Sequence, residues 1–174
     1  YNQYEDFIAN KNVLARGSDN AFKVVQLYSN SAADINSYGA SIGLNTKILE
    51  GFDIGLNYTY AQFDFDQASD PDFEAGFNTP EHKVKLQFGK TDLFENFGFN
   101  INGRWQDEYL WQSTFMDATI EGRTVLDAQV NYTVPSIKSV FKLGGSNLTG
   151  QEYLSAPGVG AIGSQYYLSW SINN

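Results

Sequence analysis

The sequence contains no cysteine and only one histidine, His82. Without cysteine, disulfide frameworks, thiolate zinc sites and cysteine nucleophiles are excluded. Basic residues are also scarce: 11 lysines and arginines stand against 20 aspartates and glutamates, for a formal net charge of -9. Because nucleic-acid recognition needs a basic surface, a DNA- or RNA-binding role is a poor match. No apolar run approaches the roughly 18 residues that a membrane-spanning helix requires, which excludes a helical membrane protein.

Aromatic residues and glycine are abundant, and they favour β-structure. Aromatics make up 16% of the 174 residues, glycine occurs 16 times, and only 18% of residues are charged. Aromatic side chains fit a pleated surface, and glycine marks turns and bulges. Apolar and polar residues alternate with a period of two along most of the chain, which predicts strands. We expect no helix and about nine strands, near 1–11, 20–30, 37–48, 52–61, 83–88, 97–106, 123–134, 138–147 and 165–172.

The connections between these strands alternate in length. Short turns are expected near Glu50, Asp92 and Pro135, and the connections between them are long and rich in Asp, Gly, Ser and Asn. These long stretches are 67–79, 111–121 and 148–162. If successive strands are antiparallel neighbours, all short turns lie at one end of the sheet and all long loops at the other. Strands of roughly 10 residues with unequal ends are the sequence signature of an antiparallel transmembrane β-barrel.

The two faces of the expected strands favour the same architecture. One face carries Gly, Asn, Ser and Gln with few charges, unlike the charged outer face of a soluble sandwich. The other face is apolar and has large aromatic residues near both strand ends, where amphipathic rings suit the two interfaces of a membrane. We therefore expect the apolar face to contact lipid. The expected lipid-facing aromatics are Phe52, Tyr58, Tyr60, Phe88, Phe97, Phe99, Trp105, Tyr132, Tyr166 and Trp170.

Pairing registers that bring polar residues opposite polar residues also bring opposite charges together. The expected charge pairs on the lumen side are Lys47 with Asp53, Arg104 with Asp127, and Glu108 with Arg123. The register that forms the last two pairs also puts Phe99 opposite Tyr132. A charge on the lipid side costs about 2–4 kcal/mol at the membrane midplane, whereas a charge on the lumen side can pair or be hydrated.

Motifs for other chemistry are present but lack their structural context. The stretch 158–163 (GVGAIG) matches a dinucleotide fingerprint, yet an aromatic strand follows it where a helix is required. The acidic residues between Asp64 and Glu74 lack the spacing and the central glycine of a calcium loop. With one histidine, no cysteine and no carboxylate in an apolar setting, no catalytic group of residues emerges. We expect no enzyme activity, no metal and no cofactor.

Five segments resemble a known family. They are 77–83 (FNTPEHK), 105–111 (WQDEYLW), 127–130 (DAQV), 142–148 (KLGGSNL) and the ending 166–174 (YYLSWSINN). Together they resemble the C-terminal barrel strands of TonB-dependent outer-membrane receptors, in particular the group with a carboxypeptidase-regulatory-like N-terminal extension. The ending is similar to a final barrel strand, although its last residue is Asn174 where outer-membrane proteins usually place an aromatic residue.

The resemblance implies a fold, a location and a set of partners. Such receptors have a 22-stranded barrel filled by a plug domain, and they import scarce nutrients across the Gram-negative outer membrane with energy passed through the TonB complex. Residues 1–174 would form the C-terminal part of the barrel, with the plug and the TonB-binding segment outside this sequence. Because lipid does not tolerate open sheet edges, other residues must complete the barrel.

The long loops would then contact the solute or a surface partner such as a lipoprotein. Aromatic and amide side chains suit a sugar or a peptide, and the loop candidates are Trp111, Gln112 and Tyr153. Two other architectures remain open: a small stand-alone outer-membrane barrel that serves as an adhesin or scaffold, and a soluble carbohydrate-binding β-sandwich. A small barrel needs bulky side chains inside, whereas the expected inward residues here are mostly small.

Overall fold

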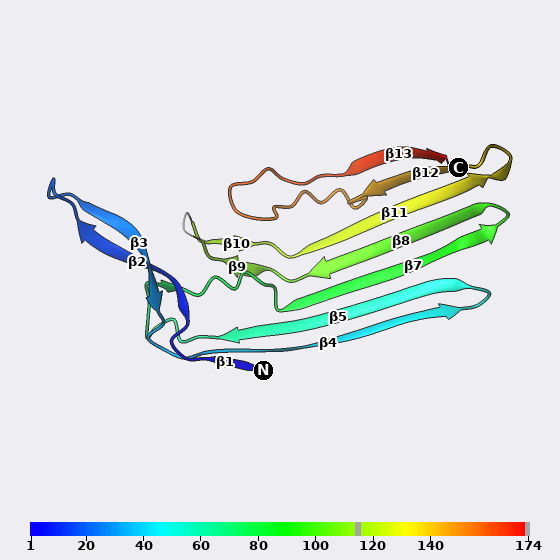
Figure 1. Ribbon diagram of the computed structural model, residues 1–174. Helices are drawn as coiled ribbons and strands as arrows, with labels where there is room; N and C mark the ends of the chain where they lie inside the picture. Colours follow the sequence, from blue (N-terminus) through cyan, green and yellow to red (C-terminus); the bar gives the residue numbers. More distant parts are fainter. Residues whose placement is uncertain (114–115, 173–174) are drawn as a thin grey trace.

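The computed structural model describes residues 1–113 and 116–172, in which antiparallel strands predominate and are joined by turns and loops (Figure 1). Within these residues the only helical element is a 3-10 turn, η1 (Pro135–Ile137). No helix in the described part of the chain is both long and apolar enough to cross a membrane. The expected all-β class is confirmed. Residues 114–115 of the expected second long loop, and Asn173 and Asn174 of the ending that resembles a final barrel strand, lie outside the described residues.

Eight strands form the main sheet, which we call the wall. In spatial order they are β1 (Asn2–Tyr4), β4 (Ile35–Ile48), β5 (Phe52–Asp64), β7 (His82–Phe94), β8 (Phe97–Gln106), β11 (Arg123–Val134), β12 (Ser139–Ser146) and β13 (Gln165–Ile172). Each strand is antiparallel to its neighbours. Figure 1 shows the short turns at one end of the wall and the long loops at the other. The expected asymmetry of the connections is therefore present.

Two small sheets lie among the long loops. The first joins β3 (Phe22–Asn30), β2 (Ile8–Arg16) and β6 (Phe73–Glu74), and the second joins β9 (Tyr109–Trp111) and β10 (Ala118–Ile120). The β2–β3 hairpin projects beyond the long-loop end of the wall (Figure 1). The strand expected near 1–11 is thus divided. Its first part belongs to the wall and its second part to the hairpin, with Asp6 at a positive φ of 53° between them.

Turn residues with positive φ set the short-turn end of the wall. Leu49, Glu50 and Gly51 connect β4 to β5, with φ angles of 35°, 57° and 95°. The turn expected near Asp92 lies later in the chain, because β7 continues to Phe94 through an irregularity in the β7–β8 pairing. Asn96 makes that turn at φ 64°, a conformation that asparagine tolerates better than most residues.

The expected register of the β4–β5 hairpin is confirmed, whereas the expected register of β8 and β11 is wrong by two residues. Lys47 lies opposite Asp53, as expected. In the second hairpin Arg104 lies opposite Val125, and the expected partner Asp127 lies opposite Asn102. The other expected oppositions fail in the same way: Arg123 lies opposite Gln106, Phe99 opposite Val130, and Tyr132 opposite Phe97. A shift of two keeps every side chain on its face, so the alternation of polar and apolar residues does not distinguish the two registers.

Within residues 1–113 and 116–172, the wall is a single layer with no second sheet against its apolar face. Large apolar side chains on that face remain exposed, including Ile42 at 67%, Leu168 at 77% and Trp170 at 62%. This contradicts the sandwich alternative, in which such residues would be buried between two sheets. The outermost strands β1 and β13 each pair with one neighbour among the described residues. The sheet is therefore open, which contradicts a complete small barrel built from this chain alone.

Candidate functional site

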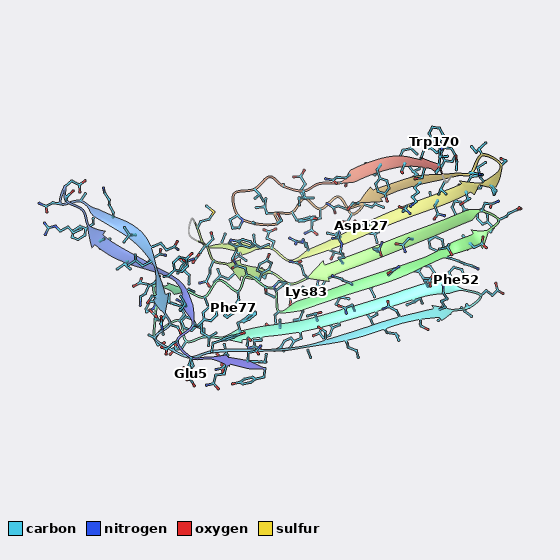
Figure 2. All side chains as sticks on the ribbon, viewed as in Figure 1. Glu5, Phe52, Phe77, Lys83, Asp127 and Trp170 are labelled. Carbon is cyan, nitrogen blue, oxygen red and sulfur yellow. The ribbon has the colours of Figure 1, made fainter. Side chains whose placement is uncertain are left out.

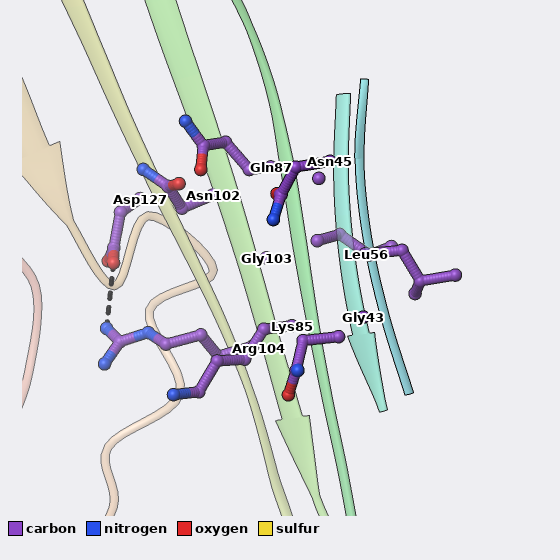
Figure 3. Close-up of a pocket in the computed structure, with 12 residues that line it drawn as sticks. Gly43, Asn45, Leu56, Lys85, Gln87, Asn102, Gly103, Arg104 and Asp127 are labelled. Atoms are coloured by element: carbon purple, nitrogen blue, oxygen red, sulfur yellow. Dashed lines mark hydrogen bonds and ion pairs between the residues drawn. The ribbon is translucent and has the colours of Figure 1, made fainter. Parts of the chain in front are cut away.

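The polar face of the wall is lined by amides, hydroxyls and glycines that bond to one another. Ser41 Oγ donates to Thr59 Oγ1 at 3.1 Å, and Tyr167 OH donates to Gln129 Oε1 at 2.9 Å. Because many of these side chains are small, they leave space above the sheet on this face. A hollow of about 450 Å³ crosses the face from β4 to β11 (Figure 3). Its polar lining residues are Asn45, Asn57, Lys85, Gln87, Asn102, Arg104 and Asp127.

Two of the three expected charge pairs are in contact on this face. Lys47 Nζ lies 2.7 Å from Asp53 Oδ1 at the short-turn end. Arg104 Nη2 lies 2.8 Å from Asp127 Oδ2, although the two residues are diagonal neighbours rather than opposite ones. The other carboxylate oxygen of Asp127 accepts hydrogen bonds from Ser146 Oγ at 2.7 Å and from the backbone N–H of Asn147 at 3.0 Å. Both carboxylate oxygens of Asp127 therefore accept hydrogen bonds from residues of the wall and from the residue that follows β12.

The third expected pair is wrong: no ion pair joins Glu108 and Arg123 in the part of the chain that the structure describes. The two-residue shift puts Gln106 opposite Arg123. The Arg123 guanidinium instead lies over the Tyr153 ring, 4.5 Å from its centroid, and Nη1 donates to the Leu154 carbonyl at 2.9 Å. Arg123 thus contacts the last long loop.

The three loop candidates do not form one site. Gln112 joins two loops, because its backbone N–H donates to Asn78 Oδ1 at 2.7 Å and its Oε1 accepts from the Gly76 N–H at 3.2 Å. Trp111 belongs to the β9–β10 pairing. Tyr153 lines a hollow on the polar face, together with Lys83, Lys85, Arg104 and Arg123.

The loop that carries Tyr153 is held by Asn147, which sequence reasoning missed. Asn147 is 1% exposed and adopts φ 54° directly after β12. Its Nδ2 donates to the Gln151 carbonyl at 2.8 Å and to the Ile162 carbonyl at 3.4 Å. An asparagine at the end of a strand is a recognisable turn signal, but its two carbonyl partners follow only from the folded loop.

The apolar face carries aromatic groups at both ends of the strands, as expected. At the short-turn end the rings of Phe52 and Phe88 stack at 5.5 Å, and Lys90 Nζ lies 4.8 Å from the Phe52 centroid. At the long-loop end Tyr58 OH lies 2.8 Å from His82 Nδ1. Figure 2 shows Phe52 and Trp170 near the turns. The remaining expected lipid-facing residues share this face by register: Tyr60, Phe97, Phe99, Trp105, Tyr132 and Tyr166.

The family described as TonB dependent receptor-like, beta-barrel matches residues 1–148. The chain belongs to this family. Its members are transporters and receptors rather than enzymes, and they are outer-membrane proteins of Gram-negative bacteria. The family generally works with a plug domain and TonB. A comparison of the sequence with curated proteins found no match.

Solved receptor structures share the fold. The FrpB iron transporter from Neisseria meningitidis is 13% identical with a TM-score of 0.66, and the match covers 97% of this chain and 27% of that one. The siderophore receptor PirA from Acinetobacter baumannii is 15% identical, with a TM-score of 0.61 and coverage of 97% and 28%. The ferric-catecholate import receptor Fiu from E. coli K12 is 18% identical, with a TM-score of 0.59 and coverage of 96% and 22%. The chain therefore spans about a quarter of the length of these receptors.

Proposed function

We propose that this chain forms wall and extracellular loops of an outer-membrane transporter that imports a scarce nutrient through its lumen. The observation that carries the proposal is the open single-layer sheet, with one exposed aromatic face and one hollowed polar face. In this arrangement the aromatic face contacts lipid and the polar face lines the lumen. The ion pairs of the wall support this orientation, because charged side chains avoid the lipid side.

The rest of the transporter comes from outside residues 1–174. We place this chain in the C-terminal part of the barrel, where the open edges of β1 and β13 pair with further barrel strands. A plug domain fills the lumen, and a segment outside this chain engages the TonB complex. The long loops lie outside the cell and contact the solute or a surface partner such as a lipoprotein. Iron complexes are the first nutrient to test, because the similar structures named above are iron and siderophore receptors.

Uptake by cells tests this role. The complete receptor should fractionate with the outer membrane, and cells that express it should accumulate a labelled ferric complex only while TonB is present. Deletion of the receptor gene should reduce uptake to the level of the TonB-deficient strain. Recovery of the complete protein in the soluble fraction would overturn the membrane role. Uptake that is unchanged without TonB would overturn the energised transport.

A further inference from the structure

Four cationic side chains gather on the polar face toward the long-loop end of the wall. Lys83, Lys85, Arg104 and Arg123 form this group, which we call the basic cluster. Lys85 on β7 lies directly opposite Arg104 on β8. Two residues further along the strands, Gln106 of β8 lies opposite both Lys83 of β7 and Arg123 of β11. Adjacent strands are about 4.8 Å apart and alternate residues of one strand about 7 Å apart, so the Cα atoms of the cluster span about 10 Å by 7 Å.

Acidic residues are scarce in the two hollows that the basic cluster lines, and Glu121 and Glu152 line a separate hollow that Tyr153 also borders. The hollow that the basic cluster lines has a volume of about 190 Å³, and its described lining contains no aspartate or glutamate. Among the lining residues of the larger adjoining hollow the one acidic residue is Asp127, which already pairs with Arg104. Lys83 and Lys85 form no ion pair with any residue that the structure describes. The cluster therefore holds an excess of positive charge.

This arrangement is unfavourable for the wall alone. Like charges directly opposite one another on neighbouring strands are destabilising, and Lys85 and Arg104 are placed in this way. The chain as a whole is acidic, yet four of its 11 basic residues meet here. Near the short-turn end of the same face, by contrast, Lys47 contacts Asp53. A bound anion would relieve the repulsion within the cluster.

Arg123 is held in place at one side of this hollow by the last long loop. Its guanidinium lies 4.5 Å from the centroid of the Tyr153 ring, and Nη1 donates to the Leu154 carbonyl at 2.9 Å. A guanidinium has five N–H donors in a rigid plane, so a single carbonyl acceptor leaves others for a ligand. Because the loop restricts the side chain, less conformational freedom is lost when a ligand binds.

Building on the transport role proposed above, we propose that the basic cluster binds a solute with two or more adjacent oxyanion groups, such as carboxylates or phosphates. Arg104 and Arg123 offer planar donor sets that fit oxyanions, and Lys83 and Lys85 add compact positive charges. Because the cations are spread over about 10 Å, they match several anionic groups on one small molecule better than a monovalent ion.

Calorimetric titration of the complete purified receptor with citrate tests the site, with inorganic phosphate as a smaller anion. Citrate should bind more tightly than phosphate at low salt, and the double variant K83Q/K85Q should weaken citrate binding about tenfold or more, the loss expected for two charge-assisted contacts. The K83R/K85R variant should retain binding. The matched control is K142Q, which removes a lysine from the same face near the short-turn end.

Citrate binding that is absent, or equal in the wild type and K83Q/K85Q, would overturn the anion site. An acidic plug segment that covers the cluster would give the first of these results. The transport role is judged separately, by TonB-dependent uptake. TonB-dependent uptake without citrate binding would support the transport role and contradict the anion site. Citrate binding at the cluster without TonB-dependent uptake would support the anion site and contradict the transport role.

Discussion

The wall and the projecting β2–β3 hairpin are both antiparallel ribbons, yet they are held in place differently. Each inner strand of the wall pairs with a neighbour on both sides, so backbone hydrogen bonds alone fix its position. The hairpin pairs with its third strand, β6, over two residue pairs, Asn10 with Glu74 and Lys11 with Phe73. Both side-chain faces of the wall are therefore available for contacts outside the sheet. The position of the hairpin, by contrast, depends on a few side chains.

Those side chains are polar and connect the hairpin to the loop between β5 and β7. Lys11 Nζ contacts Asp70, whose side chain is 3% exposed. Asn12 and Gln26 both donate to the Glu74 carboxylate. Near the hairpin tip the apolar residues Leu14, Phe22 and Val24 are 65%, 66% and 70% exposed. The hairpin is thus anchored at its base and exposed at its tip.

The largest expected effect concerns the two faces of the wall. Leu86→Lys places a charge in the middle of the apolar face, and we expect it to lower the free energy of unfolding by about 2–4 kcal/mol in lipid. The matched control is Gln87→Lys, one residue further along β7 on the hollowed face. Urea unfolding of the complete receptor in liposomes measures both variants. Equal losses for the two lysines would contradict the assignment of lipid and lumen sides.

A smaller effect is expected where a loop depends on one side chain. Asn147→Ala removes the amide that donates to two loop carbonyls and also places alanine at φ 54°. The loss of a buried hydrogen-bonding group costs about 1–3 kcal/mol, and we expect faster proteolysis within residues 148–163. Asn147→Gly tolerates the backbone angle but lacks the amide, so it separates the two causes. If the glycine variant resists proteolysis as well as the wild type, the amide does not anchor this loop.

The hairpin anchor should also depend on pH, with two opposing contributions. The hydrogen bond from Lys11 holds the pKa of Asp70 below its ordinary value of 3.8, so its contribution is present above that pH and is lost as the pH falls through the lowered pKa. Burial raises the pKa of Glu74 above its ordinary 4.5, so proton uptake by Glu74 stabilises the folded anchor as the pH falls toward 4.5.

We therefore expect amide protection in β2 and β3 to rise slightly as the pH falls toward about 4.5 and to decrease below 3.8. Hydrogen exchange, corrected for the pH dependence of intrinsic exchange rates, measures this profile. Asp70→Asn removes the decrease at low pH and keeps the rise that Glu74 causes. A profile in which the Asp70→Asn variant still loses protection below 3.8 would assign that loss to another group.

The architecture could be predicted from the sequence because face alternation is a local property. The register of the β4–β5 hairpin was equally accessible, since only Leu49, Glu50 and Gly51 separate the two strands and fix their alignment. The β8–β11 register was not accessible. A long loop joins these strands, and a shift of two residues preserves both faces, so charge matching was the only guide and it selected the wrong alignment.

The same error concealed the basic cluster. Arg104 and Arg123 were expected on the polar face, and the alternation within 83–88 also puts Lys83 and Lys85 on one face, but the juxtaposition of the four depends on how β7, β8 and β11 align. Pairing Arg123 with Glu108 made this end of the face seem balanced in charge. The hairpin anchor was less accessible still, because Lys11 and Asp70 are far apart in sequence and belong to segments without a regular pattern.

The smallest expected effect contrasts the ion pairs of the two regions. Lys47 and Asp53 are 68% and 37% exposed, so Lys47→Gln should change the unfolding free energy of the wall by less than about 1 kcal/mol. Lys11→Gln should have the larger local effect, because it leaves the buried Asp70 carboxylate without its partner. Urea unfolding for the first variant and hydrogen exchange of β2–β3 for the second measure the two. Both measurements give a free energy, one for unfolding of the wall and one for opening of β2–β3. If Lys47→Gln lowers the first by more than Lys11→Gln lowers the second, side-chain ion pairs stabilise the wall more than its backbone hydrogen bonds do.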